Sequence, residues 1–185
     1  MLKQYDVEIK EILLHYDPSE LERWRQGDPA LVTERVLQWD GPGMANGYGY
    51  GEFFVKRYLE NKGHEVIANE FDIYSIKSKY RDNNLRIEAA MGSSEYNRFK
   101  DILHRMFDDG IKFEQPDLCV IGPEVFFAEV KREQDPLRDP QAVFAIILQE
   151  VLGIPFKVYK LLPYGKEYSP STIYRSEILP SRYFD

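Results

Sequence analysis

The stretch 115–141, which reads QPDLCVIGPEVFFAEVKREQDPLRDPQ, limits the possible folds more than any other part of the chain. Asp117 begins a short apolar run, and Gly122-Pro123-Glu124 has the composition of a turn. A second apolar run ends in Glu129-Val130-Lys131. These features predict two antiparallel strands joined by a tight turn.

The pairing of these strands would gather charged side chains at one end, because a three-residue turn places residue 119 opposite residue 127 and Asp117 opposite Glu129. Opposed Cβ atoms lie roughly 4.5–5.5 Å apart, close enough for two carboxylates to share one hard cation. Lys131 would lie on the same face as Glu129, since side chains alternate along a strand. Burying charge among apolar neighbours is costly without partners or metal, so a functional site is expected. A bulge would instead shift the register by one residue and send these side chains to opposite faces.

The motif formed by these charged residues resembles a known signature. Pro116-Asp117, eleven intervening residues and Glu129-Val130-Lys131 resemble the pattern of PD-(D/E)XK nucleases. The resemblance covers about residues 48–162 and implies an α/β fold with a restriction-endonuclease-like αβββαβ core, a mixed sheet flanked by helices. Alternating helix and strand patterns in this range favour the same architecture.

The residues that follow the motif resemble the VRR-NUC branch of that superfamily. In this branch an Asp, a Leu and a Gln follow the ExK strand, and Asp135, Leu137 and Gln141 match them. Arg132-Glu133 departs from the branch, which often has Gly-Pro at this point. Members of the branch often act on branched or flapped DNA, and sometimes as homodimers.

The resemblance implies a divalent-metal-dependent nuclease that hydrolyses DNA phosphodiester bonds. Asp117, Glu129 and the carbonyl of Val130 would hold Mg²⁺ or Mn²⁺, ions that prefer hard oxygen ligands. Lys131 would orient the attacking water and stabilise the transition state. DNA is the expected partner, and a second copy of the chain would be needed to cut two strands symmetrically.

Glu52 and Gln141 are further site candidates by the same resemblance. Glu52 shares the apolar face of a predicted helix over 52–61, and the family directs such a Glu to the metal, either directly or through water. It could instead serve only the helix dipole, as an acid in the first turn. Gln141 follows Asp139-Pro140 at the start of another helix, where it could support the site or be an ordinary polar residue of a first turn.

The rest of the chain is expected to surround this core within a single domain of 185 residues. Residues 1–47 are interpreted as a helical extension, with helices starting at Asp17-Pro18 and Asp28-Pro29, packing through Trp24 and Trp39, and followed by a glycine-rich loop over 41–51. The remaining expected segments are a first core strand over 64–74, an insertion over 75–114, a last strand over 156–162 and a tail over 163–185 without a recognisable motif.

The insertion has two halves of different character. The segment 93–107 has the apolar spacing of an amphipathic helix. The segment 75–92 contains Lys77, Lys79, Arg81 and Arg86 beside tyrosines, which would suit contact with a phosphate backbone. An ordinary solvated hairpin or loop explains this segment equally well.

Composition excludes several classes of protein. The sequence has no run of about 18 apolar residues, so no membrane span is expected, and the first residues lack the pattern of a signal peptide, which favours a cytoplasmic location. One cysteine and three scattered histidines do not make a zinc site. The formal net charge of −7 predicts weak, salt-sensitive binding of DNA unless basic residues cluster.

Two other classes of function fit the same residues. The chain could be a nuclease-fold module that binds nucleic acid or assembles with a partner without catalysis. Alternatively, the acids and Lys131 could form a purely structural ion-pair cluster. Uptake of Mn²⁺ through Asp117 and Glu129 would separate a nuclease from the cluster.

Overall fold

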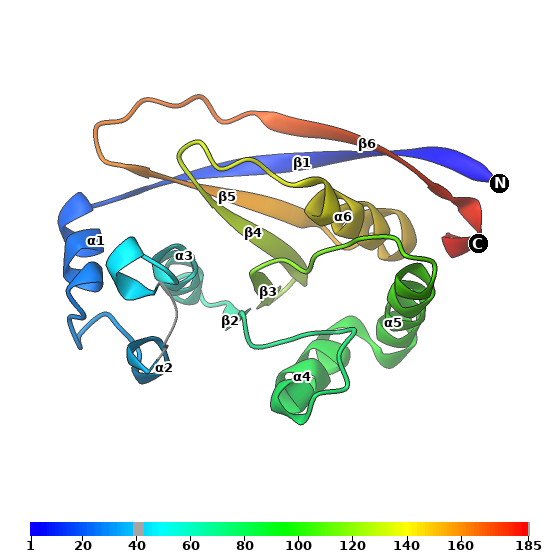
Figure 1. Ribbon diagram of the computed structural model, residues 1–185, viewed down its shortest axis with the longest axis horizontal. Helices are drawn as coiled ribbons and strands as arrows, with labels where there is room; N and C mark the ends of the chain where they lie inside the picture. Colours follow the sequence, from blue (N-terminus) through cyan, green and yellow to red (C-terminus); the bar gives the residue numbers. More distant parts are fainter. Residues whose placement is uncertain (39–42, 185) are drawn as a thin grey trace.

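The computed structural model describes residues 1–38 and 43–184. Its strands form a six-stranded sheet in the order β2-β3-β4-β5-β1-β6 (Figure 1). The bounds are β1 (Leu2–Tyr16), β2 (Glu65–Ala68), β3 (Leu118–Ile121), β4 (Phe126–Arg132), β5 (Phe156–Pro163) and β6 (Thr172–Pro180). β5 pairs in parallel with β4 and β1, and the other pairings are antiparallel. The predicted α/β class, a mixed sheet flanked by helices, is confirmed.

Helices cover both faces of this sheet. They are α1 (Pro18–Arg25), α2 (Glu34–Leu37), α3 (Tyr50–Glu60), α4 (Arg81–Met91), α5 (Ser93–Asp108) and α6 (Asp139–Leu152), with short 3₁₀ turns η1 (Met44–Asn46), η2 (Ser78–Tyr80) and η3 (Ser181–Tyr183). One apolar core lies between the sheet and α4, α5 and α6, and a second lies between the sheet and α1 and α3. No helix in the described part of the chain has both the length and the apolar character needed to cross a bilayer.

Strand β4 shows how the two cores are separated. Phe127 packs against Phe144 of α6, with ring centroids 6.1 Å apart, whereas Ala128 and Val130 belong to the core under α3. Alternation therefore assigns Glu129 and Lys131 to the α6 face. The predicted hairpin register is confirmed, because Cys119 pairs with Phe127.

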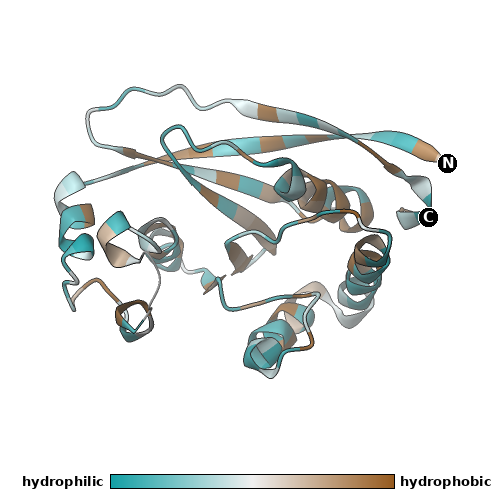
Figure 2. Cartoon of the chain, viewed as in Figure 1, coloured by the Kyte–Doolittle hydropathy of each residue, from teal (hydrophilic) through white to brown (hydrophobic). Residues whose placement is uncertain are grey.

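The prediction of helices throughout residues 1–40 is wrong for the first 16 residues. Tyr5, Val7 and Ile9 are buried while their neighbours are exposed, which is the period of a strand, and Figure 2 shows the alternation along β1. The pattern becomes effective because β1 lies between β5 and β6, which pair with its backbone. Residues 163–185, for which the sequence gives no recognisable motif, contain β6, the strand that pairs with the other side of β1.

Other boundaries also differ from the prediction. Helix α1 starts after Asp17, whose Oδ1 accepts a hydrogen bond from the Ser19 amide at 2.8 Å, as expected for an N-cap. The second helix begins at Glu34 rather than at Asp28-Pro29, and Trp39 and the start of the 41–51 loop lie outside the described residues.

The segments around the insertion show a third group of differences. The first core strand spans only Glu65–Ala68 of the predicted 64–74. The basic half of the insertion forms α4 instead of a hairpin or loop, while the amphipathic helix is confirmed as α5. Helix α6 starts at Asp139, as the Asp139-Pro140 pair indicates, with Arg138 at the N-cap and Gly153 at the C-cap.

The role of β1 in the core can be tested with Ile9→Ala. Ile9 is completely buried, so removing its side chain is expected to lower the free energy of unfolding by about 2–5 kcal/mol. Leu2→Ala is the control, because Leu2 on the same strand is 68% exposed and should change stability by less than about 0.5 kcal/mol. Urea unfolding of both variants makes the comparison, and equal stabilities would contradict the burial of β1.

Candidate active site

Four of the predicted site residues meet where β4 ends and α6 begins. Glu129 and Lys131 are each 3% exposed and Gln141 is 1% exposed, so these charged and polar groups depend on one another. Lys131 Nζ lies 3.1 Å from Glu129 Oε1, and Gln141 Nε2 donates a hydrogen bond to the same oxygen at 2.5 Å. Asp117 approaches from the start of β3, and its Oδ2 accepts a hydrogen bond from the Val130 amide at 2.9 Å.

Gln141 serves two purposes that the sequence left as alternatives. Its Oε1 accepts a hydrogen bond from the Arg138 amide at 3.1 Å, which caps α6. Its Nε2 holds Glu129. The start of α6 is therefore locked to β4 through one buried side chain.

Glu129 is only partly satisfied by these contacts. Its Oε2 is buried and has no hydrogen-bond partner among the described residues. Buried polar atoms without a partner are rare in folded proteins, and each requires a reason. An oxygen of this kind beside a second carboxylate, that of Asp117, is the arrangement that a cation would satisfy.

The electrostatics of the site also favour a bound cation. Burial, then repulsion from Glu129 and Glu52, raises the pKa of Asp117 to about 8. Burial also raises the pKa of Glu129, although Lys131 opposes this shift. The protein thus holds two acids where ionising both is unfavourable, and a bound cation would reverse that preference.

The donor set fits Mg²⁺ or Mn²⁺, because Asp117 and Glu129 offer hard oxygen atoms. In the described ranges 1–38 and 43–184, no three His, Cys, Asp or Glu side chains form a group that could hold a metal. Two protein carboxylates with water or substrate in the other positions is, however, a usual Mg²⁺ environment. For Val130 the recorded contact is made by its amide, and ligation by its carbonyl stays a prediction.

Glu52 faces the site from α3. Its Oε1 accepts a hydrogen bond from Asn69 Nδ2 at 3.1 Å, and it is near enough to raise the pKa of Asp117. Glu52 also lies in the first turn of α3, where its negative charge interacts favourably with the helix dipole. The two interpretations of Glu52 are compatible.

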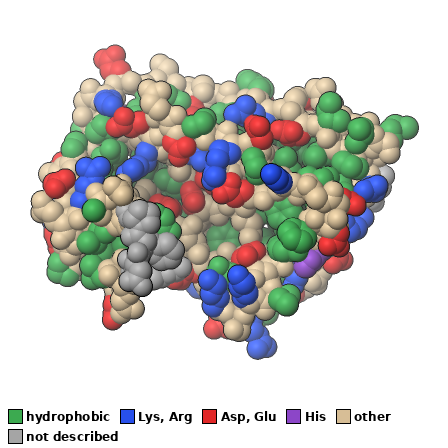
Figure 3. Space-filling view, in the orientation of Figure 1, with side chains coloured by type: hydrophobic (Ala, Val, Ile, Leu, Met, Phe, Trp, Pro, Cys, Tyr) green, Lys and Arg blue, Asp and Glu red, His purple; other side chains and the backbone are tan. Residues whose placement is uncertain are grey.

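A cleft of about 390 Å³ is lined by the site residues Glu52, Asp117, Glu129 and Lys131. Figure 3 shows acidic and basic side chains close together around the hollow in the middle of one face of the molecule. The wall opposite β4 is the glycine-rich turn 46–49, in which Gly47 has a φ of 75°. A Cβ at Gly47 would lie 2.9 Å from Arg132 Nη1, so glycine allows the turn and the arginine to approach each other closely.

Lys160 is a buried cation that the sequence analysis missed. It pairs with Lys131 across β5 and β4, is 6% exposed, and donates from Nζ to the Asp135 carbonyl at 3.0 Å. Asp135 Oδ2 lies 3.8 Å from Lys131 Nζ, so one residue of the loop after β4 contacts both lysines. A lysine within the apolar run 156–162 was the available signal.

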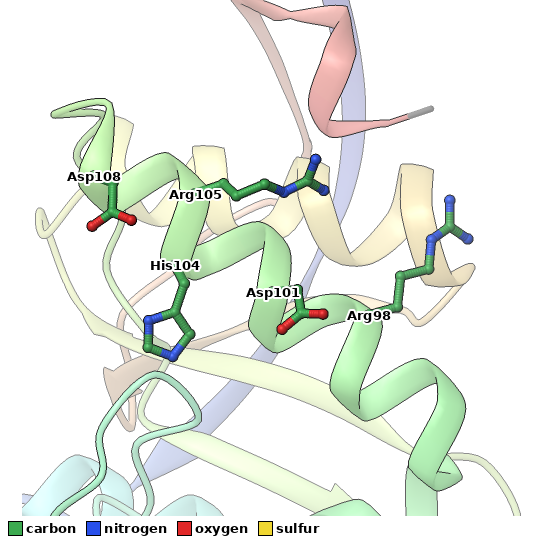
Figure 4. Close-up of a pocket in the computed structure, with 5 residues that line it drawn as sticks. All are labelled: Arg98, Asp101, His104, Arg105 and Asp108. Atoms are coloured by element: carbon green, nitrogen blue, oxygen red, sulfur yellow. The ribbon is translucent and has the colours of Figure 1, made fainter.

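A different hollow lies on the outer surface of α5. Figure 4 shows its lining residues, which project from successive turns of this one helix: Arg98, Asp101, His104, Arg105 and Asp108. Arg98 and Arg105 donate hydrogen bonds to backbone carbonyls, and the His104 ring packs 4.5 Å from that of Tyr74. Mixed charges on one helix face are typical of a solvated surface, so we assign no chemistry to this hollow.

No model of a known protein family matches the chain, and no curated protein matches it. The resemblance to PD-(D/E)XK nucleases consists of short motifs and their spacing. The interpretation of the site therefore depends on the residues and the geometry described above.

Proposed function

We propose that the protein is a nuclease that uses a divalent metal ion to hydrolyse phosphodiester bonds in DNA. One observation carries the proposal: Glu129 and Lys131 are buried beside the half-buried Asp117 in a cleft, and one oxygen of Glu129 has no partner among the described residues. A cleft that buries charge and leaves it partly unsatisfied is better suited to a ligand than to stability.

The roles of the side chains follow from their positions. Mg²⁺ or Mn²⁺ held by Asp117 and Glu129 would supply an acidified water and positive charge beside the phosphate. The Lys131 ammonium carries three donors and uses one on Glu129 at 3.1 Å, so another can orient a water or contact a phosphate oxygen. Gln141 keeps Glu129 in place, and Glu52 faces the same cleft from α3.

Local charge offsets the acidic composition of the chain. Lys131, Arg132 and Arg138 all line the cleft. Arg132 Nη1 is buried and has no hydrogen-bond partner in the described part of the chain, and Arg138 pairs with Glu114 at 2.6 Å. A phosphate entering the cleft would therefore meet the Arg132 guanidinium besides Lys131, with the salt sensitivity expected of such contacts.

A structural ion-pair cluster accounts for these observations less well. It explains the contact between Lys131 and Glu129, which would be a satisfied pair. It does not explain why the half-buried Asp117 lies beside them with a raised pKa, or why Glu129 Oε2 lacks a partner among the described residues. Those two features favour a cation site.

The test is cleavage of labelled DNA of four kinds, namely single strands, duplexes, flaps and four-way junctions, with Mg²⁺, Mn²⁺ or EDTA. We expect cleavage of at least one of them that depends on the metal. Folded protein that binds Mn²⁺ but cuts none of them would favour the inactive module. Protein that does not bind Mn²⁺ at all would favour the structural cluster.

A further inference from the structure

A second hollow, of about 540 Å³, adjoins the candidate active site. Its walls come from α2, α3, the edge strand β2 and α4. Tyr48, Gly49 and Glu52 line both hollows, which therefore share a boundary. Tyr48 is 48% exposed at this boundary.

The apolar part of this second hollow is aromatic and held in place. Phe53 and Trp24 lie with ring centroids 4.9 Å apart, and Trp24 is almost completely buried. The Trp24 indole N–H donates a hydrogen bond to the Tyr48 carbonyl at 2.9 Å, which fixes the backbone that carries the Tyr48 ring. Phe53 is only partly exposed, because Trp24 packs against it and the Arg57 guanidinium lies 5.0 Å from its ring centroid. The aromatic surface that the hollow offers to a flat ligand is therefore provided by Tyr48 and the exposed part of Phe53.

The charged part of the hollow is already neutralised within the protein. Lys56 lies 2.8 Å from Glu60, Arg86 lies 2.6 Å from Glu65, and Arg57 lies 2.8 Å from Glu20. Because each of these cations has a carboxylate partner, the hollow has little attraction for a phosphate. This distinguishes it from the neighbouring cleft, where the Arg132 guanidinium has a nitrogen without a partner in the described chain.

Polar groups on the lining can both donate and accept hydrogen bonds. Asn69 contributes a side-chain amide, and Glu52 contributes a carboxylate beside it. The amide of Asn83 is already bonded to the Glu70 carbonyl and to Arg86. An uncharged planar ligand with a hydrogen-bonding edge would satisfy the aromatic and the polar parts of this lining together. A nucleobase has both properties, and its phosphate would remain in the cleft next to it.

We propose that this hollow receives one unpaired nucleobase of the DNA strand whose phosphate lies in the active-site cleft. The inference rests on the proposed nuclease function and specifies its substrate. A base within a duplex cannot turn its face toward a side wall, so the base must leave the stack. Stacking on aromatic side chains such as Tyr48 stabilises an unstacked base of any sequence. The preferred DNA is then single-stranded, or locally unpaired, beside the cut.

The test compares two duplexes that differ by one base. Each has a single-nucleotide bulge, which fixes the position of the unpaired residue, and in one duplex the bulged nucleotide is abasic. Fluorescence anisotropy in EDTA measures affinity without cleavage. We expect the wild-type protein to bind the base-bearing bulge about fivefold or more tightly, which is the effect of one stacked base. Equal affinities would overturn the proposal.

Tyr48→Ala is expected to reduce the ratio of affinities for the base-bearing and the abasic bulge to near one. Tyr164→Ala is the matched control, since Tyr164 is 67% exposed and contacts His15 in another part of the molecule. Both substitutions remove exposed rings, so both variants are expected to fold. The comparison of the two duplexes with wild-type protein tests the proposal without any variant. A preference that is unchanged in Tyr48→Ala would remove Tyr48 from the proposal and overturn it as stated.

The outcomes separate this inference from the proposed function. Metal-dependent cleavage without any effect of the abasic nucleotide would refute the base pocket alone. A base-dependent affinity in protein that never cuts DNA would refute the nuclease and keep the pocket. Free adenosine that competes at concentrations near those of the bulged DNA would assign the hollow to a small molecule and overturn the proposal.

Discussion

Lys131→Met is expected to reduce the rate of DNA cleavage by about 10²–10³-fold or more, with little change in DNA affinity. The ammonium group contacts Glu129 and faces the cleft, where charge develops on the phosphate during hydrolysis. Methionine fills a similar space without the charge, so the effect of packing is small. Single-turnover cleavage and DNA binding, measured on the same preparations, separate the rate of the chemical step from affinity.

Lys157→Met is the control for this experiment. Lys157 lies on the neighbouring strand β5, is partly buried, and has its Nζ 3.6 Å from the centre of the Phe126 ring, outside the cleft. Its loss should leave the cleavage rate near that of the wild type. The thermal stability of both variants should be measured as well, because removing the Lys131 ammonium leaves Glu129 buried without its cation. A folded Lys131→Met protein that cleaves at the wild-type rate would refute the role assigned to Lys131.

Asp117→Asn is expected to abolish metal-dependent cleavage and, at the same time, to stabilise the metal-free protein by about 0.5–2 kcal/mol at pH 9. The side-chain oxygen of the new asparagine can still accept the hydrogen bond from the Val130 backbone N–H, while the repulsion from Glu129 and Glu52 disappears. A stability gain together with a loss of activity is typical of residues kept for function.

The pH dependence of this effect has a definite sign. The pKa of Asp117 is about 8 in the folded metal-free protein, against an ordinary value of 3.8. The folded state therefore binds the Asp117 proton more tightly than the unfolded state does. The stabilisation that this proton gives to the folded protein is complete only when the pH is below the ordinary pKa. It decreases as the pH rises and is lost once the pH passes the folded pKa. The advantage of Asp117→Asn should grow from pH 5 to pH 9 in urea unfolding with EDTA.

Mn²⁺ should reverse the order of stability of the wild type and Asp117→Asn. It is expected to raise the melting temperature of the wild type and not that of Asp117→Asn, since binding to the folded state alone stabilises it. Asp108→Asn, an exposed position on α5, should behave as the wild type does. If Mn²⁺ stabilised the wild type and Asp117→Asn equally, Asp117 would not be a ligand.

Much of the site could be predicted from the sequence because its residues belong to two adjacent strands and the helix that follows them. The turn at 122–124 and the alternation of side chains determine which residues of β3 and β4 share a face, and the observed pairing of Cys119 with Phe127 agrees. Gln141 is a candidate through the family resemblance, and the start of α6 places it beside Glu129. Information of this kind is local, since each residue is positioned by neighbours a few residues away.

The outer strands of the sheet could not be predicted in the same way. Residues 2–16 have a strand period at Tyr5, Val7 and Ile9, but the apolar run at 12–14 is also compatible with a helix. What selects the strand is pairing with β5 and β6, whose residues lie more than a hundred positions away. Such partners become neighbours only when the whole sheet is assembled.

The contacts that complete the cleft have the same origin. Lys160 from β5, Asn69 after β2 and the turn at 46–49 reach the site from three distant parts of the chain. The sequence by itself determined the acids, the lysine and the face that they share, because strand alternation and turn geometry act over short range. Only the tertiary structure decided which walls enclose them, because long-range pairing and packing depend on segments that no local pattern connects.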